Sequence, residues 1–95
     1  MKGAELVVRA LEQQGVDYVF GYPGGAVLPT TNAVTEYPIH FVLTRHEQGA
    51  AFMADVHGRL TGEAGVCLGT LGPGATNLIT GVADGNMDRA PMVVI

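Results

Sequence analysis

Short apolar runs alternate with longer helical patterns along this chain, and this alternation limits its fold more than any other feature. Helical patterns lie at residues 3–14, 27–34 and 47–61, and a further one follows the GPGATN loop and runs to about residue 87. The apolar runs are DYVFG, PIHFVLT, AGVCLGTL and PMVVI. Strands that are apolar on both faces and separated by helices are typical of parallel sheets. The sequence therefore predicts an α/β fold in which helices cover both faces of a parallel sheet.

Three loops rich in small residues follow the first three predicted strands. They read GYPGGA, RHEQGA and LGPGATN in chain order. In a parallel sheet the carboxyl ends of the strands share one edge, and ligands bind in the loops at that edge. The sequence therefore predicts that any ligand site lies where these three loops meet.

Composition and charge exclude several classes of protein. The net charge is -4, and the five basic residues are spread along the chain, which argues against a nucleic-acid surface. No apolar run is long enough to span a membrane. The one cysteine, Cys67, lies in an apolar run, so we expect a buried thiol in a reducing compartment and a cytoplasmic protein. A lone cysteine also rules out an internal disulfide and a metal site built from several cysteines, and we expect no metal-binding residues within this chain.

The last five residues, PMVVI, form a predicted core strand. Domain boundaries normally fall in exposed polar segments. We therefore expect residues 1–95 to be the N-terminal piece of a longer chain, truncated before its sheet is complete.

Glu47 is the most informative single residue, because it lies where a predicted strand gives way to a helix. Its carboxylate could interact with the dipole of that helix, or it could pair with Arg45 on the surface. A third reading makes it a functional acid, with Gly49 and two alanines keeping the space around it open. The residues alone leave all three readings open, whereas we expect the neighbouring His46 to be structural.

The two glycine-rich loops also have structural and functional interpretations. In GPGATN, Gly72 and Gly74 precede a helix, as in phosphate-binding loops. Asn77 stands where the dinucleotide fingerprint has its third glycine, and the lysine of a P-loop is missing, so this interpretation is weak. In YPGG, Gly24 and Gly25 could simply form a tight turn, or they could let a ligand approach the backbone.

Small residues also recur at helical spacing in the 47–61 segment, at Ala50, Ala54 and Gly58. Such a stripe lets another element approach closely. It predicts either packing within the chain or a helix pair across a dimer interface, and the spacing does not choose between them.

Taken together, VFGYPGGAVLP, LTRHEQGAAFMADVHGRLTG and GVCLGTLGPGATNLITGVADGNMDRAP resemble the N-terminal, pyrimidine-binding domain of thiamine-diphosphate enzymes. Within that superfamily they look most like the large subunits of acetolactate synthases, also called acetohydroxyacid synthases. The resemblance covers essentially all 95 residues. It implies that residues 1–95 are the N-terminal part of such a domain, and that the central and C-terminal diphosphate- and Mg²⁺-binding domains are absent from this chain.

The resemblance implies a role for individual residues. In the family the glutamate that matches Glu47 faces the N1′ nitrogen of the cofactor and shares a proton with it, and we expect burial to raise its pKa. Gly25 matches a glycine whose backbone N–H lies near developing negative charge. The other implied cofactor-binding residues are Tyr22, Pro23, Gly24, Pro73 and Asn77.

The resemblance also implies an activity. The intact enzyme would decarboxylate pyruvate on thiamine diphosphate and join the product to a second 2-oxo acid, in branched-chain amino-acid biosynthesis. Mg²⁺, and in many relatives FAD, would bind through the absent domains. The implied assembly is a homodimer or larger oligomer with a shared active site, with a regulatory small subunit as a further partner. We expect the 95-residue piece alone to be inactive.

Other activities stay open at this point. A 2-oxo acid decarboxylase or a pyruvate oxidase would share the same scaffold. A non-catalytic α/β binding module or a gene remnant would share the same layout without binding thiamine diphosphate.

Overall fold

The computed structural model describes residues 2–95, which form a four-stranded parallel sheet in the order β2-β1-β3-β4. The strands are β1 (Tyr18–Gly21), β2 (His40–Leu43), β3 (Gly65–Leu68) and β4 (Met92–Val94). The helices are α1 (Gly3–Gln13), α2 (Leu28–Val34), α3 (Glu47–Thr61) and α4 (Pro73–Met87), and a 3₁₀ turn, η1 (Gly25–Val27), precedes α2.

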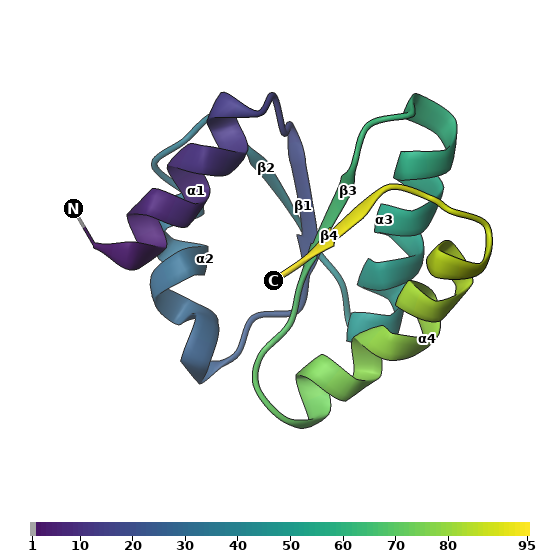
Figure 1. The fold of residues 1–95 in the computed structure, drawn as a ribbon. Helices are drawn as coiled ribbons and strands as arrows, with labels where there is room; N and C mark the ends of the chain where they lie inside the picture. The colour runs from purple at the N-terminus through teal and green to yellow at the C-terminus, as the bar shows by residue number, and fades with distance from the viewer. Residues whose placement is uncertain (1) are drawn as a thin grey trace.

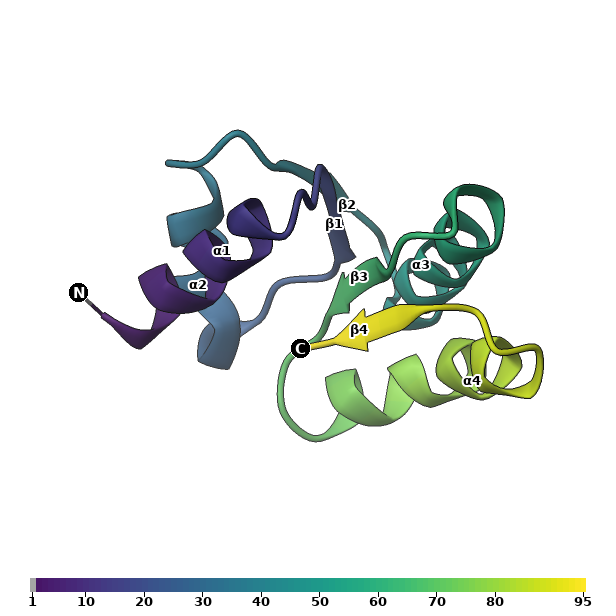
Figure 2. The ribbon, with the colours of Figure 1, turned by 45° about the horizontal axis from the view of Figure 1, so that its top comes forward.

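The helices form two layers, one on each side of the sheet. Helices α1 and α2 lie together on one face, and α3 and α4 lie together on the other (Figure 1). The rotated view shows the same separation, with β4 running beside α4 (Figure 2). The predicted α/β fold, with a parallel sheet covered on both faces, is confirmed.

Glycines with positive φ set several element boundaries. Gly15 (φ 79°) follows α1, and Gly62 (φ 75°) caps α3 by donating its N–H to the carbonyl of Gly58. Gly72 (φ 65°) immediately precedes α4, whose first residue is Pro73. The predicted helices therefore end close to where they were expected. The strands are shorter than the apolar runs that predicted them, because the ends of those runs turn into the loops.

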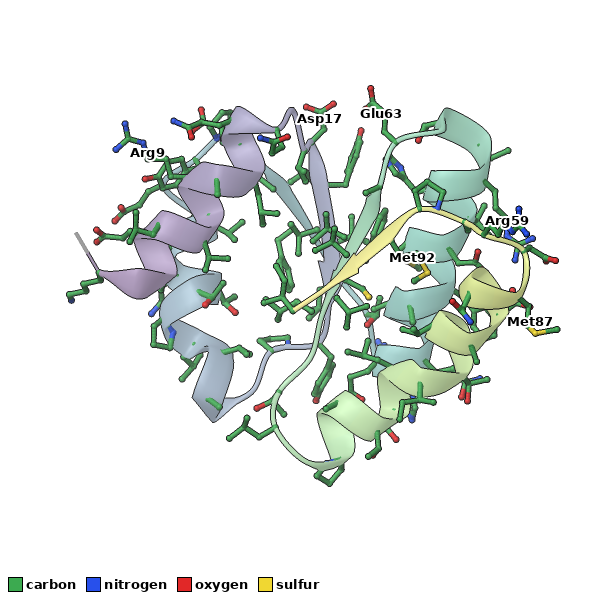
Figure 3. All side chains as sticks on the ribbon, viewed as in Figure 1. Arg9, Asp17, Arg59, Glu63, Met87 and Met92 are labelled. Carbon is green, nitrogen blue, oxygen red and sulfur yellow. The ribbon has the colours of Figure 1, made fainter. Side chains whose placement is uncertain are left out.

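The core has two parts of different character. Between the sheet and α1–α2 it consists of branched aliphatic residues, such as Val8, Val19 and Leu68. On the α3–α4 side it consists mainly of small residues, including three alanines and Cys67. Side chains fill the space between the sheet and each helical layer, and charged groups such as Arg9 and Glu63 point outward (Figure 3). The layer of α3 and α4 can therefore lie close to the sheet.

The small residues of α3 pack within the chain. Ala50 and Ala54 have no exposed surface, and a side chain at Gly58 would collide with Pro91. The stripe thus faces the sheet and the segment leading into β4, which favours packing within the chain over a helix pair across a dimer interface.

Glycines of α4 allow the two helices of this layer to touch. A Cβ atom at Gly81 would lie 2.9 Å from the carbonyl carbon of Ala51, and one at Gly85 would collide with Met92. Glycine in the middle of a helix costs about 1 kcal/mol relative to alanine. Here it is required because backbone or side-chain atoms of neighbouring elements occupy the space of a side chain.

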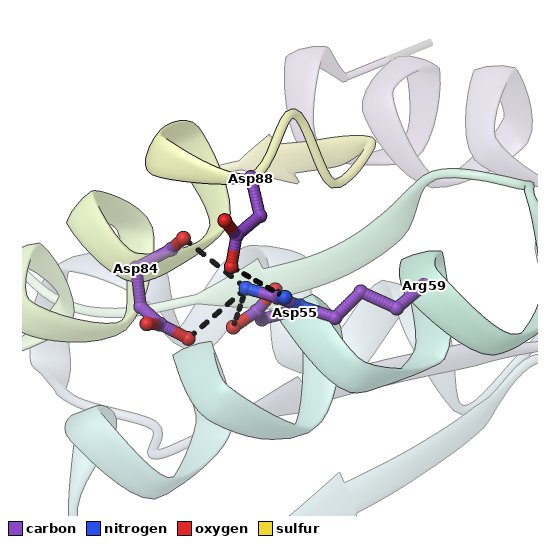
Figure 4. A network of polar contacts seen from close by, with 4 residues as sticks. All are labelled: Asp55, Arg59, Asp84 and Asp88. Atoms are coloured by element: carbon purple, nitrogen blue, oxygen red, sulfur yellow. Dashed lines mark hydrogen bonds and ion pairs between the residues drawn. The ribbon is translucent and has the colours of Figure 1, made fainter.

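One arginine joins the far ends of α3 and α4. Arg59 contacts Asp55 (Nε–Oδ1, 2.7 Å), Asp84 (Nη2–Oδ2, 3.2 Å) and Asp88 (Nη1–Oδ2, 2.7 Å), as Figure 4 shows. Asp55 is almost fully buried, with 1% of its side chain exposed, whereas Asp84 and Asp88 lie at the surface. The guanidinium therefore neutralises a buried carboxylate and ties α4 to α3 at the same time.

Candidate active site

The sheet order places a crevice at the carboxyl ends of β1 and β3. From β1 the chain crosses to β2 on one side, and from β2 it crosses back to β3 on the other. Where the direction of winding reverses in this way, the loops after the two central strands diverge, and open α/β sheets bind ligands there. Because all strand pairs are parallel, the loops after β1, β2 and β3 do lie at the same edge, as predicted.

Glu47 is the first residue of α3 and lies at this edge, with 7% of its surface exposed. The preceding residue, His46, caps the helix by accepting the backbone N–H of Gln48 on Nδ1 at 3.0 Å, so its predicted structural role is confirmed. Asn77 of α4 donates its side-chain amide to Oε2 of Glu47 at 3.0 Å. Two residues thirty positions apart in sequence are therefore in direct contact.

The surface pairing of Glu47 with Arg45 is not formed. Every ion pair among residues 2–95 involves Arg59, and Arg45 is exposed. The helix-dipole reading holds as far as position is concerned, because Glu47 lies in the first turn of α3. Interaction with a helix dipole does not require a carboxylate to be buried or to contact a second helix, and Glu47 is both buried and in contact with α4.

The amide of Asn77 holds the pKa of Glu47 below its ordinary value. Burial acts in the opposite direction but is the smaller effect, and the residue's own backbone N–H and the nearby His46 add to the lowering. Burial therefore acts as expected, but the expectation of a raised pKa is wrong for the protein without a ligand, because the amide outweighs burial. Glu47 is an ionised carboxylate at neutral pH.

Thr70, which was not among the predicted site residues, joins the loop after β1 to the start of α4. A Cβ atom at Gly24 would lie 2.7 Å from the Cβ of Thr70, and one at Gly74 would lie 2.8 Å from its methyl carbon. A Cβ atom at Gly74 would also lie 3.8 Å from Oε1 of Glu47. Thr70 lies two residues beyond β3, so the strand-end rule that pointed to the glycine loops could also have found it.

The two adjacent glycines of the YPGG loop differ in their surroundings. The space beside Gly24 is filled by Thr70, so this glycine serves packing within the chain. Nothing lies within 4 Å of a Cβ built on Gly25, and its φ is not positive, so neither packing nor backbone conformation requires a glycine there. That open space fits the prediction that a ligand approaches the backbone at Gly25.

The remaining predicted site residues lie on the same loops but do not contact Glu47 through hydrogen bonds within the described chain. Tyr22 directly follows β1 and is 44% exposed, and Pro23 is half-buried beside it. Pro73 is exposed at the first position of α4, where its fixed φ suits a helix start. Their roles stay predictions.

A cavity of about 610 Å³ lies at the opposite edge of the sheet, beside the amino ends of the strands. Asp17, Tyr18, His57 and Glu63 are among the residues that line it. It contains none of the predicted site residues, and the edge that holds Glu47 and Asn77 is the one where parallel sheets bind ligands.

Comparison with known proteins matches residues 1–95 to the family described as "Thiamine pyrophosphate enzyme, N-terminal TPP binding domain". The large subunits of acetolactate synthase isozymes 2 and 3 of Escherichia coli (strain K12) are 55% and 58% identical over 95 and 96 residues. The probable acetolactate synthase large subunit of Methanocaldococcus jannaschii is 53% identical over 95 residues.

These alignments cover 100% of this chain but only 16% or 17% of each relative, so the chain spans about one sixth of their length. The family match, by contrast, covers every residue from 1 to 95. The resemblance of the three loop motifs is thereby confirmed. The chain belongs to the thiamine pyrophosphate (thiamine diphosphate) enzymes, as their N-terminal cofactor-binding domain.

Proposed function

We propose that this chain is part of an acetolactate synthase large subunit, which joins the two-carbon unit of pyruvate to a second 2-oxo acid. The observation that carries the proposal is the hydrogen bond between the half-buried Asn77 and the buried Glu47 at the ligand-binding edge of the sheet. Support for the specific activity comes from relatives of that name that align over the whole chain at 53% to 58% identity.

The donor set of the site fits the pyrimidine end of thiamine diphosphate. A planar aminopyrimidine presents a ring nitrogen, which an acid can protonate, and a flat face, which needs bare backbone beside it. Glu47 supplies the carboxyl group, and Gly25 supplies open backbone. Tyr22, Pro23, Gly24, Pro73 and Asn77 complete the proposed cofactor-binding set.

When bound, thiamine diphosphate supplies the carbon nucleophile and the electron sink that decarboxylation of a 2-oxo acid needs. Glu47 takes up a proton and holds it at the ring nitrogen, in a site where little water competes. In this proposal the backbone N–H of Gly25 donates to a developing negative charge. Glu47 is held at the start of α3, and its partner Asn77 is held near the start of α4.

The rest of the proposed enzyme lies outside this chain. No group of three His, Cys, Asp or Glu side chains gathers to hold a metal ion among residues 2–95. We assign Mg²⁺, and FAD where it is used, to the central and C-terminal domains of the longer protein. The proposed assembly is a homodimer or larger oligomer with a shared active site and a regulatory small subunit, with pyruvate and a second 2-oxo acid as substrates.

The proposal includes a cytoplasmic location. Within the described chain no helix combines the length and the apolar character needed to cross a bilayer. The single cysteine is free and buried, which fits a reducing compartment.

The test uses the full-length protein that carries this chain. Supplied with thiamine diphosphate, Mg²⁺ and pyruvate, it should form acetolactate, and Glu47→Gln should lower kcat about 10²- to 10⁴-fold, the usual contribution of a general acid or base. Glu63→Gln, at an exposed position outside the site, is the matched control and should leave kcat unchanged.

Other outcomes would contradict specific parts of the proposal. Acetaldehyde or an acetyl product in place of acetolactate would assign the chain to a decarboxylase or an oxidase. Unchanged turnover in Glu47→Gln would remove the role given to that residue. Failure of the full-length protein to bind thiamine diphosphate would indicate a non-catalytic module.

A further inference from the structure

The two carboxylate oxygens of Glu47 have different surroundings. Oε2 accepts the amide of Asn77 at 3.0 Å, and this is the one side-chain hydrogen bond that reaches Glu47 within the described chain. Oε1 lies on the side of Gly74, at 3.8 Å from the point where a Cβ atom would stand. Because Gly74 has no side chain, no Cβ atom stands beside that oxygen at this position of α4.

Both of these features come from one turn of α4. Gly74 and Asn77 are three residues apart on the helix and therefore lie on the same face, toward Glu47. Asn77 is half-buried, and its backbone is fixed by the close contact of α4 with α3 around Gly81. The contact between the amide and Glu47 is therefore made by residues of this chain alone.

We propose that Asn77 is a positioning residue for Glu47, whose amide occupies Oε2 and so leaves Oε1 as the oxygen that meets the ring nitrogen of the cofactor. This inference rests on the proposed function and deepens it. In this inference the amide of Asn77 acts on the carboxylate of Glu47. The family resemblance, by contrast, implies only that Asn77 lines the pyrimidine pocket.

The charge state of Glu47 follows from the same contact. From its own helix, the titratable group that acts on Glu47 is His46. Asn77 and Gly74 face it from α4, and Thr70 packs against Gly74 from the loop after β3, and none of these three titrates. Asn77 thus favours the ionised form before binding, and Glu47 takes up its proton when the cofactor arrives.

The experiment compares Asn77→Leu with the wild type in the full-length protein. Leucine has the branched shape of asparagine, although it is larger, and it cannot donate a hydrogen bond. Loss of a hydrogen bond to a charged group should lower kcat/KM about 10- to 100-fold. The basic limb of the pH profile of kcat/KM should move to higher pH, because Glu47 works in its protonated form and the lowering effect of the amide on its pKa is lost.

A binding measurement on the apoprotein provides a readout that does not depend on turnover. Isothermal titration calorimetry in buffers of different ionisation enthalpy gives the number of protons taken up when thiamine diphosphate binds. The uptake that exceeds that of Glu47→Gln belongs to Glu47. As the pH is lowered, this excess should begin to fall at a higher pH in Asn77→Leu than in the wild type. The reason is that the carboxyl group of Glu47 in the variant is already partly protonated before the cofactor binds.

Three further variants make the result specific. Asn77→Gln keeps an amide and should recover part of the activity. Asn77→Ala removes the amide without adding bulk, and it is measured alongside in case leucine disturbs folding. Asn86→Leu makes the same change at an exposed position of α4 and should behave as the wild type.

The outcomes separate this inference from the proposed function. If the wild type binds thiamine diphosphate but Asn77→Leu and Asn77→Ala keep the wild-type pH profile and proton uptake, the positioning role is wrong and the function stands. If the wild type does not bind thiamine diphosphate, the proposed function is wrong and this inference is overturned with it.

Discussion

The contact between α3 and α4 predicts that the same substitution will have opposite effects at two glycines. In Gly81→Ala the new methyl group would lie 2.9 Å from the carbonyl carbon of Ala51 and from the backbone nitrogen of Phe52. In Gly49→Ala, in the first turn of α3, it would meet nothing within 4 Å. Both glycines are helical, so the intrinsic gain from alanine is similar at the two sites.

The magnitudes follow from packing and helix propensity. At Gly49 the gain is about 0.5 to 1 kcal/mol in the free energy of unfolding. At Gly81 a comparable gain is outweighed by overpacking, which typically costs 1–3 kcal/mol. The 2.9 Å contacts are 0.5 Å shorter than the 3.4 Å at which ordinary contact begins, and they involve backbone that cannot rotate away. We expect a net loss of about 1 to 2 kcal/mol.

Thermal or urea unfolding followed by circular dichroism measures both effects on the purified protein. The two variants should shift the unfolding midpoint in opposite directions, by several degrees each if the domain unfolds as one unit. The new methyl group at position 81 would also collide with the methyl group of Ala51. Adding Ala51→Gly to Gly81→Ala removes that methyl group and should recover part of the loss. Gly81→Ala with a midpoint at or above that of the wild type would refute the close contact of the two helices.

Three further predictions concern the ion-pair cluster, the cysteine and the YPGG loop. Arg59→Met should lower the unfolding midpoint at neutral pH. The lowered pKa of Asp55, caused first by its hydrogen bond to Arg59, stabilises the fold above the unfolded pKa, so the difference from the wild type should shrink as pH falls toward 3 in unfolding series. Burial raises the pKa of Cys67 to about 11, so Ellman's reagent should not react with it at pH 8 until denaturant is added; rapid native labelling would contradict its burial. Gly25→Ala should not lower the unfolding midpoint yet should weaken thiamine diphosphate binding by the full-length protein, whereas Gly24→Ala should lower the midpoint; equal losses of stability would contradict the open space at Gly25.

The sequence was sufficient for features that depend on local chemistry. Helix α3 was predicted at residues 47–61 with Gly62 as its end, and the structure places it at Glu47–Thr61 with Gly62 as its left-handed cap. The layered α/β order followed from apolar runs between helices. The run AGVCLGTL overestimated its strand, because only Gly65–Leu68 pairs and the last residues leave the sheet.

Features that depend on the meeting of distant segments could not be predicted in this way. The contact between Asn77 and Glu47 joins two helices, and only the sheet order brings their first turns together. Asp55 and Arg59 are one helical turn apart, but nothing local indicates that Asp84 and Asp88 meet the same guanidinium. The pKa of Glu47 was predicted in the wrong direction for this reason, since burial was foreseen and the amide was not.

The joining of α3 to α4 has a mechanical consequence. The pair is fastened at one end by Glu47 and Asn77, at the other by Arg59, and between them by backbone in direct contact at Gly81. Two helices held at three points move as one rigid body. We therefore expect the distance between the acid and its amide to stay constant while other parts of the site adapt to a ligand.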